Sequence, residues 1–339
     1  MKKFLAIAIA VIMTASLAAC TGNEATTTQN TTQASTSSYE AIDISIAALK
    51  GPTGMGLAKL IDDSEKGDTE NNYTFTIEGD PTQVVALISN GEIDMAACPL
   101  NLASTLYQKT QGEVQMVAVN TLGVLYIIEN GNAINSMADL KGKTIYATGL
   151  GATPEYILDN LLKANSLEPG VDVTVEYLSE HSELLTKVVL GDVDICMLPE
   201  PNVTTALSKN KDLRIALDLT DEWNNSYNQT QSKLAQGCII VNKLFAQENP
   251  QAVDKFLEEY EASVNFVNKN IDQAAQLIAK QEIIPSAEIA KKAIPTCNIV
   301  CITGGQMKTI AQQNLKVLFE ANVKSVGGAL PDEDFYYGG

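Results

Sequence analysis

Hydrophobic and polar positions recur along this chain at a fixed spacing. Residues 91–101 read GEIDMAACPLN, and residues 191–201 read GDVDICMLPEP. Both stretches begin with glycine, place an aspartate before an apolar run, and reach a proline after it. More residues match at the same spacing of 100: Val84 with Leu184, Ile88 with Val188, Gly51 with Gly151 and Thr53 with Thr153. An internal repeat of this kind predicts a protein built from two similar halves.

Each half alternates predicted strands with predicted helices. The segments AIDISIAAL (41–49) and KTIYAT (143–148) are rich in apolar and β-branched residues, which is typical of strands. Glycine-rich loops follow at 51–56 and 149–155, and apolar residues then recur at helical spacing. This alternation predicts an α/β fold in which mostly parallel sheets are covered by helices on both faces.

The chain is expected to pass between the two halves twice. It leaves the first half after Thr121, and the segment GCIIVNKLFAQENP (237–250) predicts a strand and a helix start that bring it back. Helices from Gln251 to about Asn322 are expected to pack on the first half. Two crossings form a hinge on which two lobes can close. The predicted division is lobe 1 at 40–129 and 238–339, and lobe 2 at 130–237.

The N-terminus predicts export. Lys2 and Lys3 precede an apolar run at 4–13 that is too short to be a durable membrane span. The ending Leu-Ala-Ala-Cys at 17–20 resembles the bacterial lipobox, in which the cysteine is lipidated and becomes the first mature residue. Residues 1–19 are therefore predicted to be a signal peptide. Residues 20–39 are predicted to be a lipidated Cys20 followed by a disordered, Ser/Thr/Gln/Asn-rich tether on the extracytoplasmic side of a cell membrane.

The charge of the chain limits its partners. It has 41 acidic and 23 basic residues, a formal net charge of −18, which argues against nucleic-acid binding. Arg214 is the single arginine, so bidentate guanidinium binding of a carboxylate or phosphate has almost no residue to make it. A bare oxyanion would instead be bound at helix N-termini, at 54–55 or at 153–155.

The cysteines and the histidine content argue against cross-links and metals. Beyond Cys20 the cysteines are Cys98, Cys196, Cys238, Cys297 and Cys301. An odd number at wide spacing indicates buried thiols rather than a disulfide framework. A single histidine and the lack of paired cysteine spacing argue against a metal site. No cofactor and no metal are expected.

The predicted ligand site lies where the strands end. In open α/β sheets, ligands bind beyond the carboxyl ends of the strands, and two lobes that present these edges to each other form a cleft. The predicted ligand-binding residues are Thr53, Gly54, Met55, Leu100, Asn101, Thr121, Gly151, Ala152, Thr153, His181 and Glu200.

Several of these residues have a second interpretation. Glu200 either contacts a ligand amine or ring N–H, or caps the helix that follows it. Thr53 and Thr153 are either ligand contacts or helix N-caps, with Pro154 opening the second helix. His181 is a ligand contact, a pH sensor or a surface residue.

Four more residues stand outside the predicted site set. Asp94 and Asp194 recur near strand starts, away from the predicted site, and are expected to be structural. Trp223 and Tyr227 either stack on an aromatic ligand or lie in the core or at the rim.

The lipobox, the tether and two α/β lobes together resemble a solute-binding lipoprotein of an ABC importer. The segments DLKGKTIYATGLGATPEYIL (139–158) and LGDVDICMLPEP (190–201) resemble the branch that binds nitrate, sulfonates, taurine and thiamine-pyrimidine precursors. The resemblance implies the two-lobed clamshell fold of the type II periplasmic binding proteins, with the glycine-rich turns at 51–56 and 149–153 at the cleft. It also implies a monomer that captures a small organic solute, sulfonate-like or pyrimidine-like, and delivers it to an ABC permease.

Two alternatives belong to other functional classes. The first is a surface lipoprotein that acts as a sensor partner or adhesin, and neighbouring permease genes would argue against it. The second is an enzyme, because a pyrimidine-synthesising enzyme of thiamine biosynthesis shares this fold. The cysteine-rich cluster of that enzyme is missing here, and export argues against an intracellular step. The chain is therefore not expected to be an enzyme.

Overall fold

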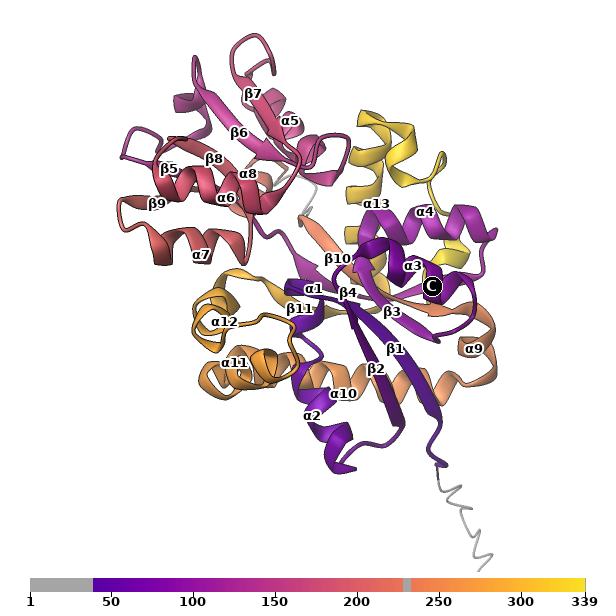
Figure 1. Ribbon diagram of the computed structural model, residues 1–339. Helices are drawn as coiled ribbons and strands as arrows, with labels where there is room; N and C mark the ends of the chain where they lie inside the picture. Colours follow the sequence, from indigo (N-terminus) through magenta and orange to yellow (C-terminus); the bar gives the residue numbers. More distant parts are fainter. Residues whose placement is uncertain (1–38, 228–232, 339) are drawn as a thin grey trace, which may run out of the picture. The chain divides into compact units, whose positions relative to one another are not determined.

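The computed structural model describes residues 39–227 and 233–338, which form two β-sheets with helices on both faces (Figure 1). All of these elements belong to one unit that starts at Ala41. The predicted signal peptide, Cys20 and most of the tether lie outside the described residues. Among the helices described, none combines the length and the apolar character needed to cross a membrane.

Sheet A has six strands in the order β11-β4-β10-β3-β1-β2. Its strands are β1 (Asp43–Leu49), β2 (Asn72–Glu78), β3 (Met95–Pro99), β4 (Val114–Leu122), β10 (Ala235–Asn242) and β11 (Ile299–Ile302). Strand β1 is parallel to β2 and β3, whereas β10 is antiparallel to β3 and β4. We call this sheet and its helices lobe 1.

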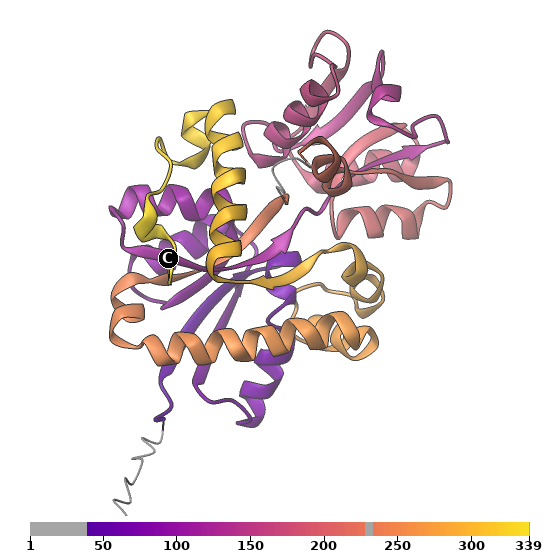
Figure 2. The same cartoon turned by 180° about the vertical axis from the view of Figure 1, so that it is seen from behind.

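Helices cover both faces of sheet A. One face packs against α3 (Pro81–Ser89), α4 (Leu100–Thr110) and α13 (Gly304–Ala321). On the other side lie α2 (Ala58–Lys66), α10 (Pro250–Lys269) and α11 (Ile271–Lys280), and Figure 2 shows α10 and α13 on opposite sides of the sheet. Shorter helices are α1 (Pro52–Met55), α9 (Lys243–Glu248), α12 (Ala287–Ala293), η3 (Ile294–Thr296), η4 (Val323–Val326) and η5 (Glu333–Phe335).

Sheet B has five strands in the order β7-β6-β8-β5-β9. They are β5 (Leu125–Asn130), β6 (Thr144–Thr148), β7 (Thr174–Leu178), β8 (Ile195–Pro199) and β9 (Leu213–Asp218). The helices α5 (Thr153–Ala164) and α8 (Leu219–Ser226) cover one face, and α6 (His181–Leu190) and α7 (Asn202–Lys209) cover the other. The turn η1 (Met137–Leu140) joins β5 to β6. We call this sheet and its helices lobe 2.

The predicted repeat is present in the fold. Lobe 1 contains the strand order β2-β1-β3-β10, and lobe 2 contains the matching order β7-β6-β8-β5. The predicted α/β fold with mostly parallel strands is confirmed, although neither sheet is wholly parallel. The reason is that β10 and β5, the strands that follow the two crossings, run antiparallel to their neighbours β3 and β8.

The crossings fall near the predicted positions. The predicted lobe boundaries at 129/130 and 237/238 lie inside β5 and β10. We propose instead that lobe 1 ends at the link between β4 and β5, at Gly123–Val124, and resumes where β10 begins at Ala235. This division keeps every strand whole within one sheet.

Two local predictions also need correction. The region from Gln251 to Asn322 is not all helical, because the short β-branched run Ile299–Ile302 forms β11 at the edge of sheet A. Thr153 is not an N-cap. Ala152 takes that position with extended backbone angles, and Thr153 is already the first residue of α5.

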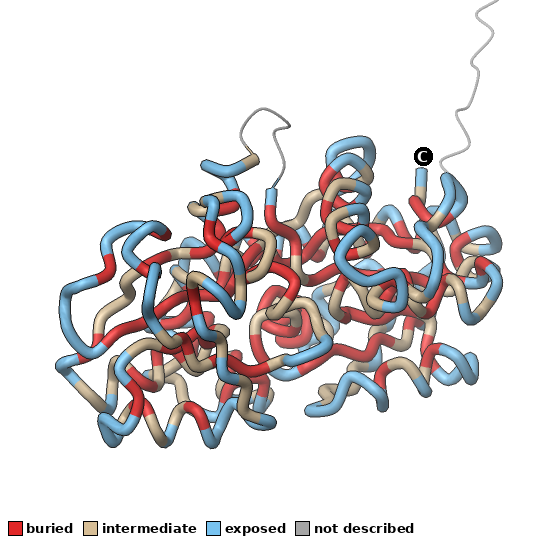
Figure 3. The backbone as a smooth tube through the Cα atoms, turned by 90° about the horizontal axis from the view of Figure 1, so that it is seen from above, coloured by how far each residue is buried: buried red, intermediate tan, exposed pale blue. Residues whose placement is uncertain are grey.

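Burial follows the strands. Most residues of the central strands are buried, whereas many residues of the connecting loops are exposed. Figure 3 shows the buried segments mainly inside the molecule and the exposed segments mainly along its outer turns. Trp223 is 1 % exposed and packs on Tyr227 with ring centroids 4.5 Å apart, so the core interpretation holds for Trp223. The cysteines from Cys98 onward are free thiols as predicted, all buried except the half-buried Cys301.

Candidate functional site

In lobe 1, two of the predicted residues meet where β4 and β10 pass the end of β1. The Asn120 Nδ2 donates to the Thr53 carbonyl at 3.1 Å, and the Thr121 hydroxyl donates to the Asn120 Oδ1 at 3.1 Å. Gly237 on β10 completes the cluster. A Cβ atom there would lie 2.4 Å from Asn120 Oδ1 and 2.6 Å from Thr53 Cγ2, so only glycine fits. We call Thr53, Asn120, Thr121 and Gly237 the lobe 1 cluster.

The other predicted residues of lobe 1 differ in exposure. Gly54 is buried, and a Cβ there would lie 2.4 Å from the Leu49 carbonyl oxygen. Met55 and Leu100 are 0 % and 2 % exposed, and Leu100 belongs to the core beneath sheet A. Asn101 is half-buried at the second position of α4. The Gly54 and Met55 N–H groups both donate to the Gly51 carbonyl, at 3.0 and 3.2 Å. Ligand contact by these residues stays a prediction.

In lobe 2, His181 lies at the start of α6 beside the end of β6. Its Nδ1 is 2.5 Å from the Thr148 hydroxyl. Desolvation of the ring lowers the pKa of His181, and the Glu180 carboxylate opposes this effect. The imidazole is therefore neutral at neutral pH, with one ring nitrogen engaged by Thr148 and the other available for a hydrogen bond.

The glycine-rich loop of lobe 2 leads into α5. Gly149 and Gly151 have φ angles of 86° and 75°, a backbone region that favours glycine. The Gly151 N–H donates to the carboxylate of Glu155 in the first turn of α5. Gly151 is exposed and Ala152 and Thr153 are half-buried. The N-terminus of α5, predicted as a place for an oxyanion, thus already lies beside a carboxylate of its own chain.

A hollow of about 490 Å³ adjoins this loop, between α5 and the end of α13. Its lining comprises Leu150, Gly151, Glu155, Tyr156, Asp159, Asn160, Lys163, Glu320, Ala321 and Asn322. The Asn322 Nδ2 donates to the Tyr156 hydroxyl at 2.8 Å and so joins the two lobes here. The lining contains three carboxylates, those of Glu155, Asp159 and Glu320, and one ammonium group, that of Lys163. Burial is the main reason that the pKa of Asp159 is raised.

Glu200 is 3 % exposed and fully engaged. Its carboxylate accepts hydrogen bonds from the Thr204 N–H at 3.1 Å, the Thr204 hydroxyl at 3.0 Å and the Thr296 hydroxyl at 2.6 Å. Burial raises the pKa of Glu200, and these hydrogen bonds counteract the rise. The capping interpretation is therefore observed, because Thr204 lies in the first turn of α7. Direct ligand contact by Glu200 stays a prediction.

The Thr296 contact connects the two lobes. Thr296 belongs to η3 of lobe 1, whereas Glu200 follows β8 of lobe 2. Tyr126 on β5 also reaches this turn, since its hydroxyl donates to the Thr296 carbonyl at 2.7 Å. We call Tyr126, Glu200 and Thr296 the interlobe bridge. A hollow of about 250 Å³ beside it is lined by Glu200, Thr204, Leu207, Ser208, Lys211, Ile215, Lys292 and Thr296.

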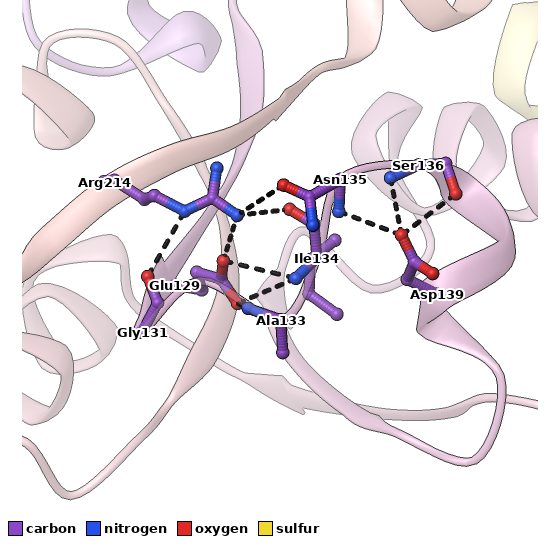
Figure 4. Close-up of polar contacts among 8 residues, drawn as sticks. All are labelled: Glu129, Gly131, Ala133, Ile134, Asn135, Ser136, Asp139 and Arg214. Carbon is purple, nitrogen blue, oxygen red and sulfur yellow. Dashed lines mark hydrogen bonds and ion pairs between the residues drawn. The ribbon is translucent and has the colours of Figure 1, made fainter.

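The single arginine serves the structure of lobe 2 (Figure 4). Arg214 forms an ion pair with Glu129, which is 2 % exposed, and it donates to the carbonyl oxygens of Gly131 and Ile134. The Glu129 carboxylate also accepts from the N–H groups of Ala133 and Ile134. This network fixes the loop after β5. The loop lies at one edge of sheet B, and Glu200 and His181 lie at the opposite edge, where β8 and β6 end.

Sequence reasoning missed four residues of these clusters. Asn120 and Gly237 lie within apolar strands, and Tyr126 reads as a core residue. Thr296 follows Pro295 in a segment without helical or strand periodicity. Only the proximity of Asn120 to Thr121 could have drawn attention to one of them.

A family model described as "NMT1/THI5 like" matches residues 74–274. None of the curated proteins compared with the chain matches it. Among solved structures, an ABC transporter protein from Parabacteroides distasonis has 23% identity and a TM-score of 0.72, covering 86% of this chain and 98% of that one.

Two other structures carry a named ligand class. The periplasmic aliphatic sulphonate binding protein SsuA from Escherichia coli has 20% identity and a TM-score of 0.67, covering 84% of this chain and 90% of that one. The periplasmic nitrate-binding protein NrtA from Synechocystis has 13% identity and a TM-score of 0.57, covering 84% and 82%. At these identities the likeness shows a shared fold, that of the two-lobed periplasmic binding proteins.

Proposed function

Because the chain belongs to the NMT1/THI5-like family, we propose that it is the solute-binding component of an ABC importer. It captures a small organic solute between its lobes and delivers it to a membrane permease. The match over residues 74–274 carries this proposal, and the fold shared with periplasmic binding proteins supports it. The role is binding and release of an unchanged solute, without catalysis.

The proposed site comprises the strand-end residues of both lobes. The residues are Thr53, Gly54, Met55, Leu100, Asn101, Thr121, Gly151, Ala152, Thr153, His181 and Glu200. The lobe 1 cluster supplies hydroxyl and amide groups, and His181 supplies a neutral imidazole. Such groups form hydrogen bonds with a polar organic solute and fix its orientation.

Of the two ligand classes, a pyrimidine-like solute fits better than a sulfonate-like one. Arg214 is held by Glu129 and by carbonyl oxygens, so it is not available to clamp a sulfonate. The hollow beside Gly151 carries the carboxylates of Glu155, Asp159 and Glu320. Like charges that face each other across an interface cost several kcal/mol, which favours a neutral or cationic ligand.

The proposed location is the outer side of a cell membrane, where the lipid on Cys20 anchors the protein. The tether at 20–39 then lets the two lobes reach a permease while remaining attached. The protein acts as a monomer in this arrangement, since a single copy contains both lobes.

A thermal-shift screen of the mature protein tests the function and the ligand class together. The panel contains aminopyrimidines, thiamine, polyamines, alkanesulfonates, taurine and nitrate. A solute at 100 times its Kd stabilises the protein by about 2.7 kcal/mol, which raises the Tm by roughly 5 °C or more. We expect an aminopyrimidine to raise the Tm and to be recovered unchanged. A sulfonate as the tightest ligand would overturn the class, and a flat response to every solute would argue against solute capture.

A pair of neighbouring variants sharpens the test. His181→Ala removes the proposed hydrogen-bonding imidazole, and Ser182→Ala changes the next exposed residue of α6. We expect the first to weaken binding about 10-fold or more and the second to leave the Kd unchanged. Equal affinities for both variants would exclude His181 from the site.

A further inference from the structure

Two of the buried cysteines lie opposite each other on adjacent strands of sheet A. Cys98 on β3 and Cys238 on β10 are register partners in an antiparallel pair. Their side chains lie in the same core cluster, with α4 and α13. Cys196 on β8 differs, because its partners on the neighbouring strands are Ile128 and Tyr146.

The antiparallel register of this pair is compatible with the spacing of a disulfide. Residues directly opposite each other in an antiparallel pair have Cα atoms about 4.5–5.5 Å apart. Disulfides span Cα separations of about 4.4–6.8 Å. From this geometry we propose that Cys98 and Cys238 are a dithiol that closes to a disulfide when the chain folds in the presence of a disulfide oxidant.

The reaction is thiol–disulfide exchange with a small disulfide such as oxidised glutathione, or with an exported thiol-oxidising protein. The thiolate of one cysteine attacks a sulfur of the oxidant, which forms a mixed disulfide and releases one thiol. The thiolate of the second cysteine then attacks the protein sulfur of the mixed disulfide. The intramolecular S–S bond forms and a second thiol leaves. The two cysteines lose two protons and two electrons, and the oxidant is reduced to two thiols.

The fold determines when this exchange can occur. In the folded protein, Cys98 is 2 % and Cys238 is 0 % exposed. Burial and the neighbouring Cys98 thiol raise the pKa of Cys238, so little of the reactive thiolate is present. The exchange therefore takes place while sheet A is still open, during folding in an oxidising compartment. Once the sheet closes, the same burial protects the bond from reduction.

The cross-link stabilises the fold without joining the lobes. The loop between Cys98 and Cys238 contains every strand of sheet B, yet both of its ends lie in sheet A. Closing so long a loop removes conformational entropy from the unfolded chain. Because the bond lies within lobe 1, it leaves lobe movement free and does not change solute affinity. The proposed disulfide and the proposed transport function can therefore be tested independently of each other.

The test is refolding of the full chain from urea, with reduced or with oxidised glutathione, followed by alkylation and peptide mapping. Under the oxidising condition we expect a cross-linked peptide pair that contains Cys98 and Cys238. We also expect a Tm at least about 5 °C above that of the reduced protein. Two free thiols at these positions under the oxidising condition would overturn the proposal, as would pairing with Cys196, Cys297 or Cys301.

Matched variants separate the pair from the other buried thiols. Cys238→Ala is expected to abolish both the cross-link and the redox dependence of the Tm. Cys196→Ala removes an equally buried strand thiol and is expected to leave both unchanged. Mapping of the unmodified chain decides the proposal on its own if the Cys238 variant does not fold.

Discussion

The two lobes share a strand order, in which β3 of lobe 1 matches β8 of lobe 2. They differ most clearly at the residue that follows these two strands. After β3 this residue is Leu100, which packs in the core of lobe 1. After β8 it is Glu200, which bonds Thr204 and, across the lobes, Thr296. The same place in the repeat therefore holds a core residue in one lobe and an interlobe contact in the other.

Away from this position the lobes agree closely. The Asn242 N–H at the end of β10 donates to the Asp94 carbonyl at 2.8 Å, and the Asn130 N–H at the end of β5 donates to the Asp194 carbonyl at 2.7 Å. The Asp94 carboxylate also accepts from the Ser45 N–H and hydroxyl, at 2.8 and 2.6 Å, which confirms its structural role. The comparison shows that repeated residues preserve each sheet, whereas the residue that departs from the repeat connects the sheets.

The largest expected effect comes from giving lobe 1 the residue of lobe 2. Leu100→Glu places a carboxylate in the core of lobe 1, where the hydroxyl at the position matching Thr204, that of Ser104, already donates to the Val326 carbonyl at 2.8 Å. A buried charge without a partner costs about 3–5 kcal/mol, so we expect a loss of that size in urea unfolding. Leu100→Met, a volume-conserving control, should cost less than about 1.5 kcal/mol. Similar losses for both variants would contradict the buried position of Leu100.

A smaller effect is expected from breaking the interlobe bridge. Thr296→Val removes the hydroxyl that donates to Glu200, and Tyr126→Phe removes the hydroxyl that donates to the Thr296 carbonyl. Each should lower the free energy of unfolding by about 1 kcal/mol. A double-mutant cycle between Thr296→Val and Glu200→Gln measures their coupling.

The control for the bridge is Thr309→Val. The Thr309 hydroxyl bonds only the Gly305 carbonyl, within α13, and the residue is exposed. Its replacement should change stability by less than about 0.5 kcal/mol. A coupling energy of zero between Thr296 and Glu200 would show that the bridge does not contribute in solution.

The smallest expected effect is the pH dependence that distinguishes Glu200 from Leu100. Burial raises the folded-state pKa of Glu200 above its ordinary value of 4.5, so the folded protein binds more protons here than the unfolded chain. The raised pKa of Glu200 therefore stabilises the folded protein fully below pH 4.5. This stabilisation is lost as the pH rises through the folded-state pKa.

The measurement compares wild type with Glu200→Gln by urea unfolding between about pH 4 and 8. The stability of the wild type relative to the variant should fall with rising pH, because the glutamine does not titrate. A difference that stays constant over this range would show that burial does not raise the pKa of Glu200.

The fold was largely predictable because its signals are local. Apolar runs that end at Pro99 and Pro199 gave the matching strands, and the glycine-rich loops gave the turns into α1 and α5. The antiparallel direction of β5 and β10 could not be predicted, since strand direction depends on where the chain re-enters a sheet. The short strand β11 was missed because four residues carry little periodicity.

The candidate site was predictable only in part. Thr53 and His181 were predicted because they follow strands in the repeat, whereas Thr121 lies within β4. The structure places Thr53 and Thr121 around Asn120, and His181 beside Thr148. The partners Asn120, Gly237, Tyr126 and Thr296 carry no sequence signal of their own. Their roles depend on contacts with residues distant in the chain.

The sequence by itself determined the two similar halves, the order of strands and helices, and the scarcity of guanidinium groups, because each is a property of neighbouring residues or of composition. The tertiary structure decided which distant residues meet. It placed Cys98 opposite Cys238, Thr296 against Tyr126 and Glu200, and Arg214 against Glu129. These contacts arise only when the chain returns through β10 and the sheets assemble, so no local pattern along the chain encodes them.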